Sequence, residues 1–177
     1  QVAVENMPAK RLFGRTVAVY HGATFAELAE WPALVLDTTH WGTWGVDPVE
    51  AYAVLKERIR HVHLSDYDGQ EHRVPFSGDL GLEGLLRALR VGGFEGIVVV
   101  ELNPWAVAGG DWSRGRLEGV LGACALRVAG LFGLSPSHNL AAQPSLADQF
   151  FAQEGEWTRR KGCAGRPDGE WPCRDKS

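Results

Sequence analysis

Cysteine is scarce in this sequence. The chain of 177 residues has three cysteines, and Cys124, Cys163 and Cys173 do not form a C-x-x-C spacing. An odd number of cysteines without that spacing indicates neither a disulfide framework nor a zinc knuckle. We therefore expect free thiols.

An excess of positive charge is missing as well. Lys and Arg number 18 against 22 for Asp and Glu, and the formal net charge is -4. Without a basic excess to follow a phosphate backbone, a nucleic-acid partner is not expected, although Arg159, Arg160 and Lys161 leave room for a local basic patch.

Long hydrophobic runs are also absent. No run approaches the roughly 18 apolar residues that cross a bilayer, and the amino terminus lacks the basic-then-apolar pattern of a signal peptide. We expect a cytoplasmic protein with no membrane partner. The chain starts at Gln1 without an initiator Met, inside an apparent buried strand, and we interpret it as a fragment.

The residues that are present indicate a globular α/β domain, with 45% hydrophobic and 23% charged content. Short apolar runs alternate with segments at helical spacing, which predicts βαβ units and a parallel sheet. The predicted strands are Val2–Glu5, Leu34–Asp37, Ile59–Leu64 and Ile97–Leu102. The predicted helices are Phe25–Glu30, Pro48–Glu57, a leucine stripe from Leu82 to Leu89, and Leu117–Leu131.

Each predicted strand has a potential metal ligand at its last or next-to-last position. The four ligands are Glu5, Asp37, His63 and Glu101. Because functional side chains of alternating β/α barrels collect at the carboxyl ends of the strands, the four are expected to meet at one point. Three carboxylates and one imidazole suit Mn²⁺, Mg²⁺ or Co²⁺, and Zn²⁺ also fits.

Taken singly, each of these residues has a plainer explanation. A lone Glu or Asp at a strand end is more often a helix cap or a solvated carboxylate than a ligand. Asp37 could simply bond the hydroxyls of Thr38 and Thr39, and His63 alone would be a core histidine. Four coincidences at consecutive strand ends are harder to explain in this way, because burying an unpaired charge is costly.

Four stretches resemble the last four strand signatures of the xylose-isomerase-like barrels, in particular the sugar phosphate isomerase/epimerase family. They are VENMP at 4–8, LDTTH at 36–40, HVHLSD at 61–66 and VELNP at 100–104. The resemblance implies a (β/α)8 TIM-barrel type of which residues 1–133 form the C-terminal half, with four strand–helix units. Residues 134–177 are interpreted as an irregular appendage with one short helix, Leu146–Gln153.

The resemblance also implies a divalent-metal-dependent isomerase or epimerase that acts on a sugar or sugar phosphate through an enediolate. The implied metal ligands are Glu5, Asp37, His63 and Glu101. Among them, Glu5 and Glu101 would also be the catalytic acid/base pair. His40 and His72 would bind substrate, and Trp41, which follows a strand end, would stack on a sugar or pack the barrel mouth.

Two other functions stay open. A type IV apurinic endonuclease would use three zinc ions and an Asp-x-His pair in the loop after His63, where this chain has Gln70 before His72. The second alternative is that the chain is an inactive fragment, because half a barrel leaves two sheet edges unpaired. Such a fragment would need a homo-oligomer or the missing N-terminal half.

Overall fold

The computed structural model describes residues 2–134. The predicted helix Leu146–Gln153, the basic triplet at 159–161 and all of the predicted appendage beyond residue 134 lie outside the described residues. None of the helices in the described part is long and apolar enough to cross a membrane.

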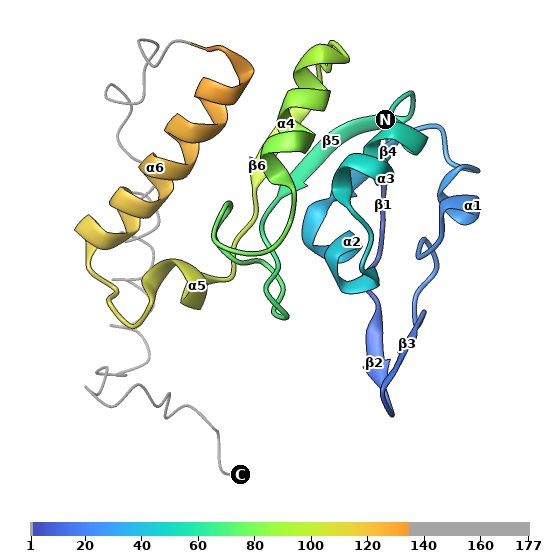
Figure 1. Ribbon diagram of the computed structural model, residues 1–177, viewed down its shortest axis with the longest axis horizontal. Coiled ribbons are helices and arrows are strands. Elements are labelled where there is room, and N and C mark those ends of the chain that lie inside the picture. The colour runs from blue at the N-terminus through green and yellow to red at the C-terminus, as the bar shows by residue number, and fades with distance from the viewer. Residues whose placement is uncertain (1, 135–177) are drawn as a thin grey trace.

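A four-stranded sheet in the order β1-β4-β5-β6 organises the fold (Figure 1). Its strands are β1 (Val4–Glu5), β4 (Leu34–Asp37), β5 (Ile59–Leu64) and β6 (Ile97–Val100). All neighbouring strands are parallel. The predicted α/β class and its parallel sheet are confirmed. Both outer strands are shorter than expected, so Glu101 follows β6 instead of lying within it.

Six helices are present in the described residues: α1 (Phe25–Leu28), α2 (Thr38–Trp44), α3 (Pro48–Leu55), α4 (Leu82–Val91), α5 (Pro104–Ala108) and α6 (Arg114–Phe132). The predicted helices correspond to α1, α3, α4 and α6. In α3, Asp47 caps the helix by accepting from the amide of Val49, and Pro48 occupies the first turn, as the sequence indicates.

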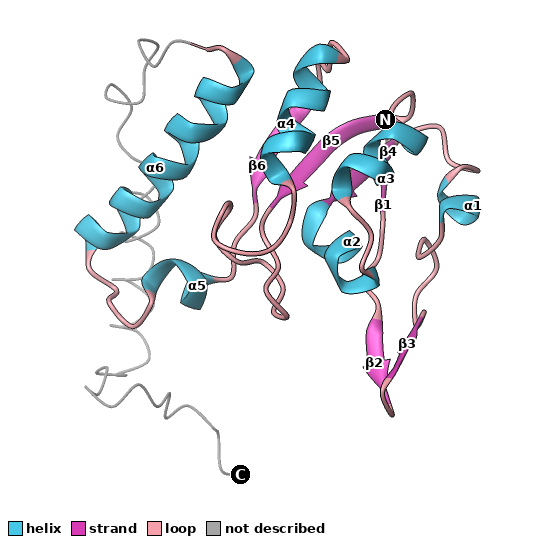
Figure 2. Cartoon of the chain, in the orientation of Figure 1, coloured by secondary structure: helices cyan, strands magenta, loops and turns pink. Residues whose placement is uncertain are grey.

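Two short helices and a hairpin were not predicted. Helices α2 and α5 begin within a few residues of a strand end, and both are capped by a side chain that belongs to a predicted site motif, Asp37 and Asn103. Strands β2 (Lys10–Leu12) and β3 (Arg15–Val17) pair antiparallel and project beyond the sheet (Figure 2). The turn between them has positive φ at both Phe13 and Gly14.

Helices α3 and α4 cover one face of the sheet and bury its core (Figure 1). On β5, Val62 and Leu64 are completely buried in the same cluster as Leu85 and Leu86 of α4. Because side chains alternate along a strand, His63 faces the opposite side. The strand register aligns His63 with Asp37 and with Val99. The site lies on this opposite face. The outer strand β6 pairs on one side only within the described residues, and its Val99 is 40% exposed.

We expect the stability of the domain to depend on the α4–sheet contact. Leu86 is 0% exposed, and Leu86→Ala is expected to lower the free energy of unfolding by about 2–5 kcal/mol, because a buried cavity replaces apolar contacts. Urea denaturation measures this loss. Val54→Ala is the control, since Val54 is 58% exposed and surface changes stay within about 0.5 kcal/mol. Equal losses in the two variants would contradict the assignment of the core.

Candidate metal centre

The four predicted ligands meet at the carboxyl end of the sheet. Glu5 ends β1, Asp37 ends β4, His63 is next to last in β5, and Glu101 follows β6. One ligand atom from each of the four lies within 4.8 Å of the others. Asp37 and His63 are direct partners in the register of β4 and β5. Glu5 pairs with Val35, and Glu101 lies two residues beyond Val99, the partner of His63, so all four positions lie within two residues of one row across the sheet.

His63 is at the centre of the group and turns Nδ1 toward all three carboxylates. Its Nδ1 lies 2.7 Å from Glu101 Oε2, 3.2 Å from Glu5 Oε1 and 3.8 Å from Asp37 Oδ2. An imidazole nitrogen and three carboxylate oxygens that converge in this way are a suitable ligand set for a divalent cation.

Asp37 is the most constrained ligand, because its side chain is 0% exposed. Its Oδ1 accepts a hydrogen bond from the His40 amide at 2.8 Å, whereas its buried Oδ2 has no hydrogen-bond partner. The pKa of this carboxyl is raised to about 7. Burial is the main cause and the charge of Glu5 adds to it, whereas the hydrogen bond from His40 acts in the opposite direction. A buried oxygen without a partner is costly, and a cation bound at Oδ2 would satisfy it.

Asn6 fixes the spacing between the first two ligands, a role for which the sequence analysis had no signal. It is 1% exposed. Its Oδ1 accepts from the Asp37 amide at 2.7 Å, and its Nδ2 donates to the Asp37 carbonyl at 3.1 Å. One side chain therefore ties the end of β1 to the end of β4 and holds Glu5 beside Asp37.

Thr38 makes the corresponding bridge between β4 and β5. Its hydroxyl donates to the Ser65 carbonyl at 2.6 Å and accepts from the Ser65 amide at 3.0 Å. Thr39 in turn donates to the carbonyl of Asp66 at 3.2 Å. The expectation that Asp37 alone would bond the hydroxyls of Thr38 and Thr39 is wrong, because both hydroxyls donate to backbone carbonyls of residues that follow His63.

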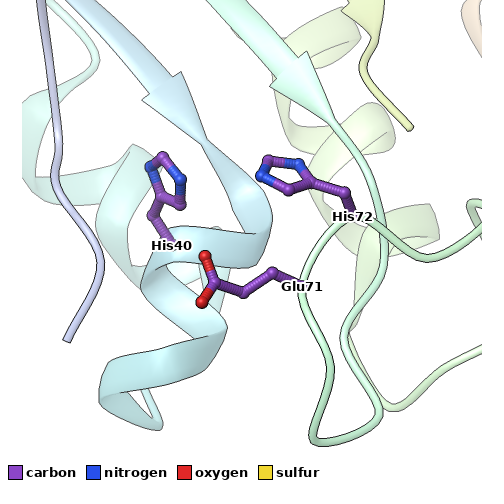
Figure 3. A group of neighbouring side chains, drawn as sticks. All are labelled: His40, Glu71 and His72. Carbon is purple, nitrogen blue, oxygen red and sulfur yellow. The ribbon is translucent and has the colours of Figure 1, made fainter. Parts of the chain in front are cut away.

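A second group lies next to the first and contains His40, Glu71 and His72, with one ligand atom of each within 4.8 Å of the others. Figure 3 shows His40 on helix α2 and the other two on the loop after β5, with their side chains directed toward a common region. His40 Nδ1 is 2.8 Å from the Asn6 carbonyl and 3.5 Å from Glu5 Oε1. Since a carbonyl only accepts, Nδ1 carries the proton of this hydrogen bond.

His72 is held in a strained backbone conformation, with φ of 57°. Its amide donates to Thr39 Oγ1 at 3.2 Å, and its carbonyl accepts from the Asn103 amide at 2.9 Å. A non-glycine residue with positive φ costs about 1–3 kcal/mol and persists where surrounding contacts fix it, often at functional sites. Contacts with α2 and with the segment after β6 therefore fix the position of His72.

The structure brings His40 and His72 to the site, but it does not bring Trp41 there. Trp41 is 2% exposed and stacks on Phe25 with 4.6 Å between ring centroids. Helix α2 starts directly after Asp37, so that its third residue, His40, faces the ligands while the next residue turns into the core. The sequence did not identify Glu71 as a site residue, because the Asp-x-His pattern places the carboxylate two residues before His72, where this chain has Gln70.

Two solved structures are similar to the fold. A D-tagatose 3-epimerase-like protein is 24% identical, with a TM-score of 0.47, over 72% of this chain and 49% of that one. A xylose isomerase domain protein from Alicyclobacillus acidocaldarius subsp. acidocaldarius is 21% identical, with a TM-score of 0.52, over 75% of this chain and 50% of that one. The chain thus spans about half the length of these structures, and the likeness to the second shows a barrel-type fold.

No curated protein matches the sequence. Residues 1–116 match the family model described as the xylose isomerase-like TIM barrel. This segment includes all four strands of the sheet and every residue of the two groups described above. The predicted resemblance is confirmed, and the chain belongs to the xylose isomerase-like TIM barrel family.

Proposed function

We propose that this chain is the metal-binding part of a sugar or sugar-phosphate isomerase or epimerase. The observation that supports the proposal most directly is the buried Asp37 Oδ2, which has no hydrogen-bond partner and lies 3.8 Å from His63 Nδ1. Glu5, Asp37, His63 and Glu101 would hold a divalent ion, for which Mn²⁺, Mg²⁺ or Co²⁺ suits the oxygen-rich set, and Zn²⁺ also fits.

A divalent ion bound there would act as a Lewis acid on the carbonyl and the adjacent hydroxyl of a ketose and so stabilise the enediolate formed by deprotonation. The protein must supply the groups that remove and return the proton. Glu5 and Glu101 are suited to this task, because their side chains are 31% and 46% exposed, whereas Asp37 is fully buried.

Glu5 and Glu101 also approach from different directions. They come from β1 and from the residue after β6, which are the two outer strands of the described sheet, and His63 lies between them. One carboxylate would take the proton from one face of the sugar and the other would return a proton to the opposite face, which is epimerisation. Return of the proton to the neighbouring carbon would be isomerisation. His40 and His72 would bind substrate hydroxyl or carbonyl groups.

We further propose that a partner covers the open face of the sheet. Strands β1 and β6 each pair on one side within the described residues, and the side chain of Ile97 on β6 is 63% exposed. A homo-oligomer or an N-terminal half barrel would cover this face.

Type IV apurinic endonuclease activity is a second candidate, and one observation favours it. That function would need a further carboxylate beside His72, for which Gln70 is a poor replacement. Glu71 lies instead within 4.8 Å of ligand atoms of His40 and His72. Glu71 would thus supply the carboxylate that the Asp-x-His pattern requires and that Gln70 cannot supply.

We expect Glu101→Gln to lower turnover by about 10²-fold or more, since the amide cannot transfer the proton. Ketoses and ketose phosphates are incubated with the full chain and Mn²⁺, Mg²⁺ or Co²⁺ in D₂O, and NMR detects deuterium at the carbon beside the carbonyl. Glu57→Gln is the matched control, because its side chain is 86% exposed at the end of α3. Absence of deuterium incorporation with every sugar and metal would contradict the proposal.

The endonuclease alternative makes a different prediction for Glu71→Gln. If the second group binds zinc for phosphodiester cleavage, the unaltered chain cleaves a duplex with an abasic site, and the variant loses both this cleavage and about one bound zinc per chain. Elemental analysis after dialysis measures the zinc. A chain that binds one zinc and leaves the duplex intact would eliminate this function.

Protonation of Asp37 predicts the pH dependence of stability in the metal-free chain. The folded state binds this proton more tightly than the unfolded state does, because the pKa is raised from 3.8 to about 7. The stabilisation is therefore complete below pH 3.8 and is lost as the pH rises to about 7. Divalent ions compete with this proton, so their affinity should weaken as the pH falls below 7.

Asp37→Asn tests this linkage, because the amide has no proton to lose. Urea denaturation in EDTA between about pH 4 and 8 should show a smaller decline in stability with rising pH for Asp37→Asn than for the unaltered chain. Glu57→Gln should retain the full decline. Identical pH profiles for Asp37→Asn and the unaltered chain would show that the buried carboxyl does not have the raised pKa.

A further inference from the structure

The loop between β5 and α4 holds two residues of the second group in a conformation that needs external support. It contains Glu71 and His72, and two of its non-glycine residues have positive φ, 57° at His72 and 68° at Phe76. Such conformations persist where contacts from other elements fix them. The contacts of Thr39 and Asn103 with the backbone fix His72, whereas Phe76 needs a different partner.

Arg127 of helix α6 provides that partner. Its guanidinium lies over the Phe76 ring, 4.0 Å from the ring centroid, and it also forms an ion pair with Glu83 of α4. Phe76 also packs against the buried core. The residue thus contacts both the core and a cation that is itself anchored on the neighbouring helix.

Arg127 lies beyond the segment that the family model matches. The family match covers residues 1–116, whereas α6 extends from Arg114 to Phe132. Arg127 of this helix therefore contacts, through Phe76, the loop that contains Glu71 and His72.

We infer that Arg127 is a positioning residue that holds the β5–α4 loop, and with it His72 and Glu71, in the geometry that receives substrate. The part of this inference that concerns substrate rests on the proposed function. The part that concerns the loop rests on the contacts of Arg127 with Phe76 and Glu83 alone.

Hydrogen–deuterium exchange of the full chain tests the hold on the loop. The amides of Arg73, Asp79 and Leu80 are hydrogen-bonded within the loop, to Asp66 or Tyr67. In Arg127→Ala these amides should exchange about two- to thirtyfold faster, the range expected for loss of a cation–π contact. Strands β4 and β5 should keep their rates.

Four further variants separate the contributions. Arg127→Lys keeps a cation over the ring and should restore most of the protection, whereas Phe76→Leu should match Arg127→Ala and add nothing to it in the double variant. Arg15→Ala, at an exposed position of β3, is the charge control and should leave the loop unchanged. Unchanged loop exchange in both Arg127→Ala and Phe76→Leu would overturn the inference, and so would faster exchange spread equally over β4 and β5.

The effect on substrate is measured separately. Arg127→Ala should raise KM by about two- to thirtyfold and leave kcat within about a factor of two, because the loop binds substrate and does not transfer the proton. A faster-exchanging loop with unchanged KM would overturn the positioning role. Absence of turnover in the unaltered chain would overturn the proposed function instead, and the exchange measurement would still decide whether Arg127 holds the loop.

Discussion

The site depends on one buried carboxylate. Asp37 stands at the end of a strand with no exposed surface, and only one of its oxygens has a hydrogen-bond partner. The cost of keeping a charge there is reflected in its pKa of about 7, which burial raises. The structure compensates for part of this cost, because the amino terminus of α2 donates to one oxygen. The other oxygen lies 3.8 Å from His63 Nδ1 and has no hydrogen-bond partner in the described residues, so a bound cation would supply the missing compensation.

Exposure increases outward from Asp37 among the ligands. The side chain of His63 is 21% exposed, that of Glu5 is 31% and that of Glu101 is 46%. A buried ligand is suited to hold an ion rigidly, because its position is determined by packing and by second hydrogen bonds. A partly exposed carboxylate reaches a substrate and exchanges protons more easily. This gradient supports the proposed separation of the four ligands into two that only anchor the ion, Asp37 and His63, and two that also transfer protons, Glu5 and Glu101.

The sequence was sufficient to predict that Glu5, Asp37, His63 and Glu101 come together, because each of them stands at or next to the end of an apolar strand, and strand ends of a parallel sheet meet in one place. It was not sufficient for features that depend on packing between distant segments. Trp41 looks like a site residue by its distance from Asp37, but the immediate start of α2 turns it into the core. Glu71 enters the second group through a loop with positive φ at His72, and no local pattern marks that conformation. The β2–β3 hairpin escaped prediction since it is short and places Phe13 at a turn position that usually favours Gly or Asn.

The bridges made by Asn6 and Thr38 have a consequence for how such a site can change by mutation during evolution. Both side chains bond backbone groups of the neighbouring strand, at residues 37 and 65. Neither bond involves the ligand side chains themselves. These two bridges therefore do not depend on which residue type stands at a ligand position. A mutation that exchanges a carboxylate for an imidazole would alter the preferred metal while the strand register stays the same, so the chemistry of the centre is free to diverge on a constant frame.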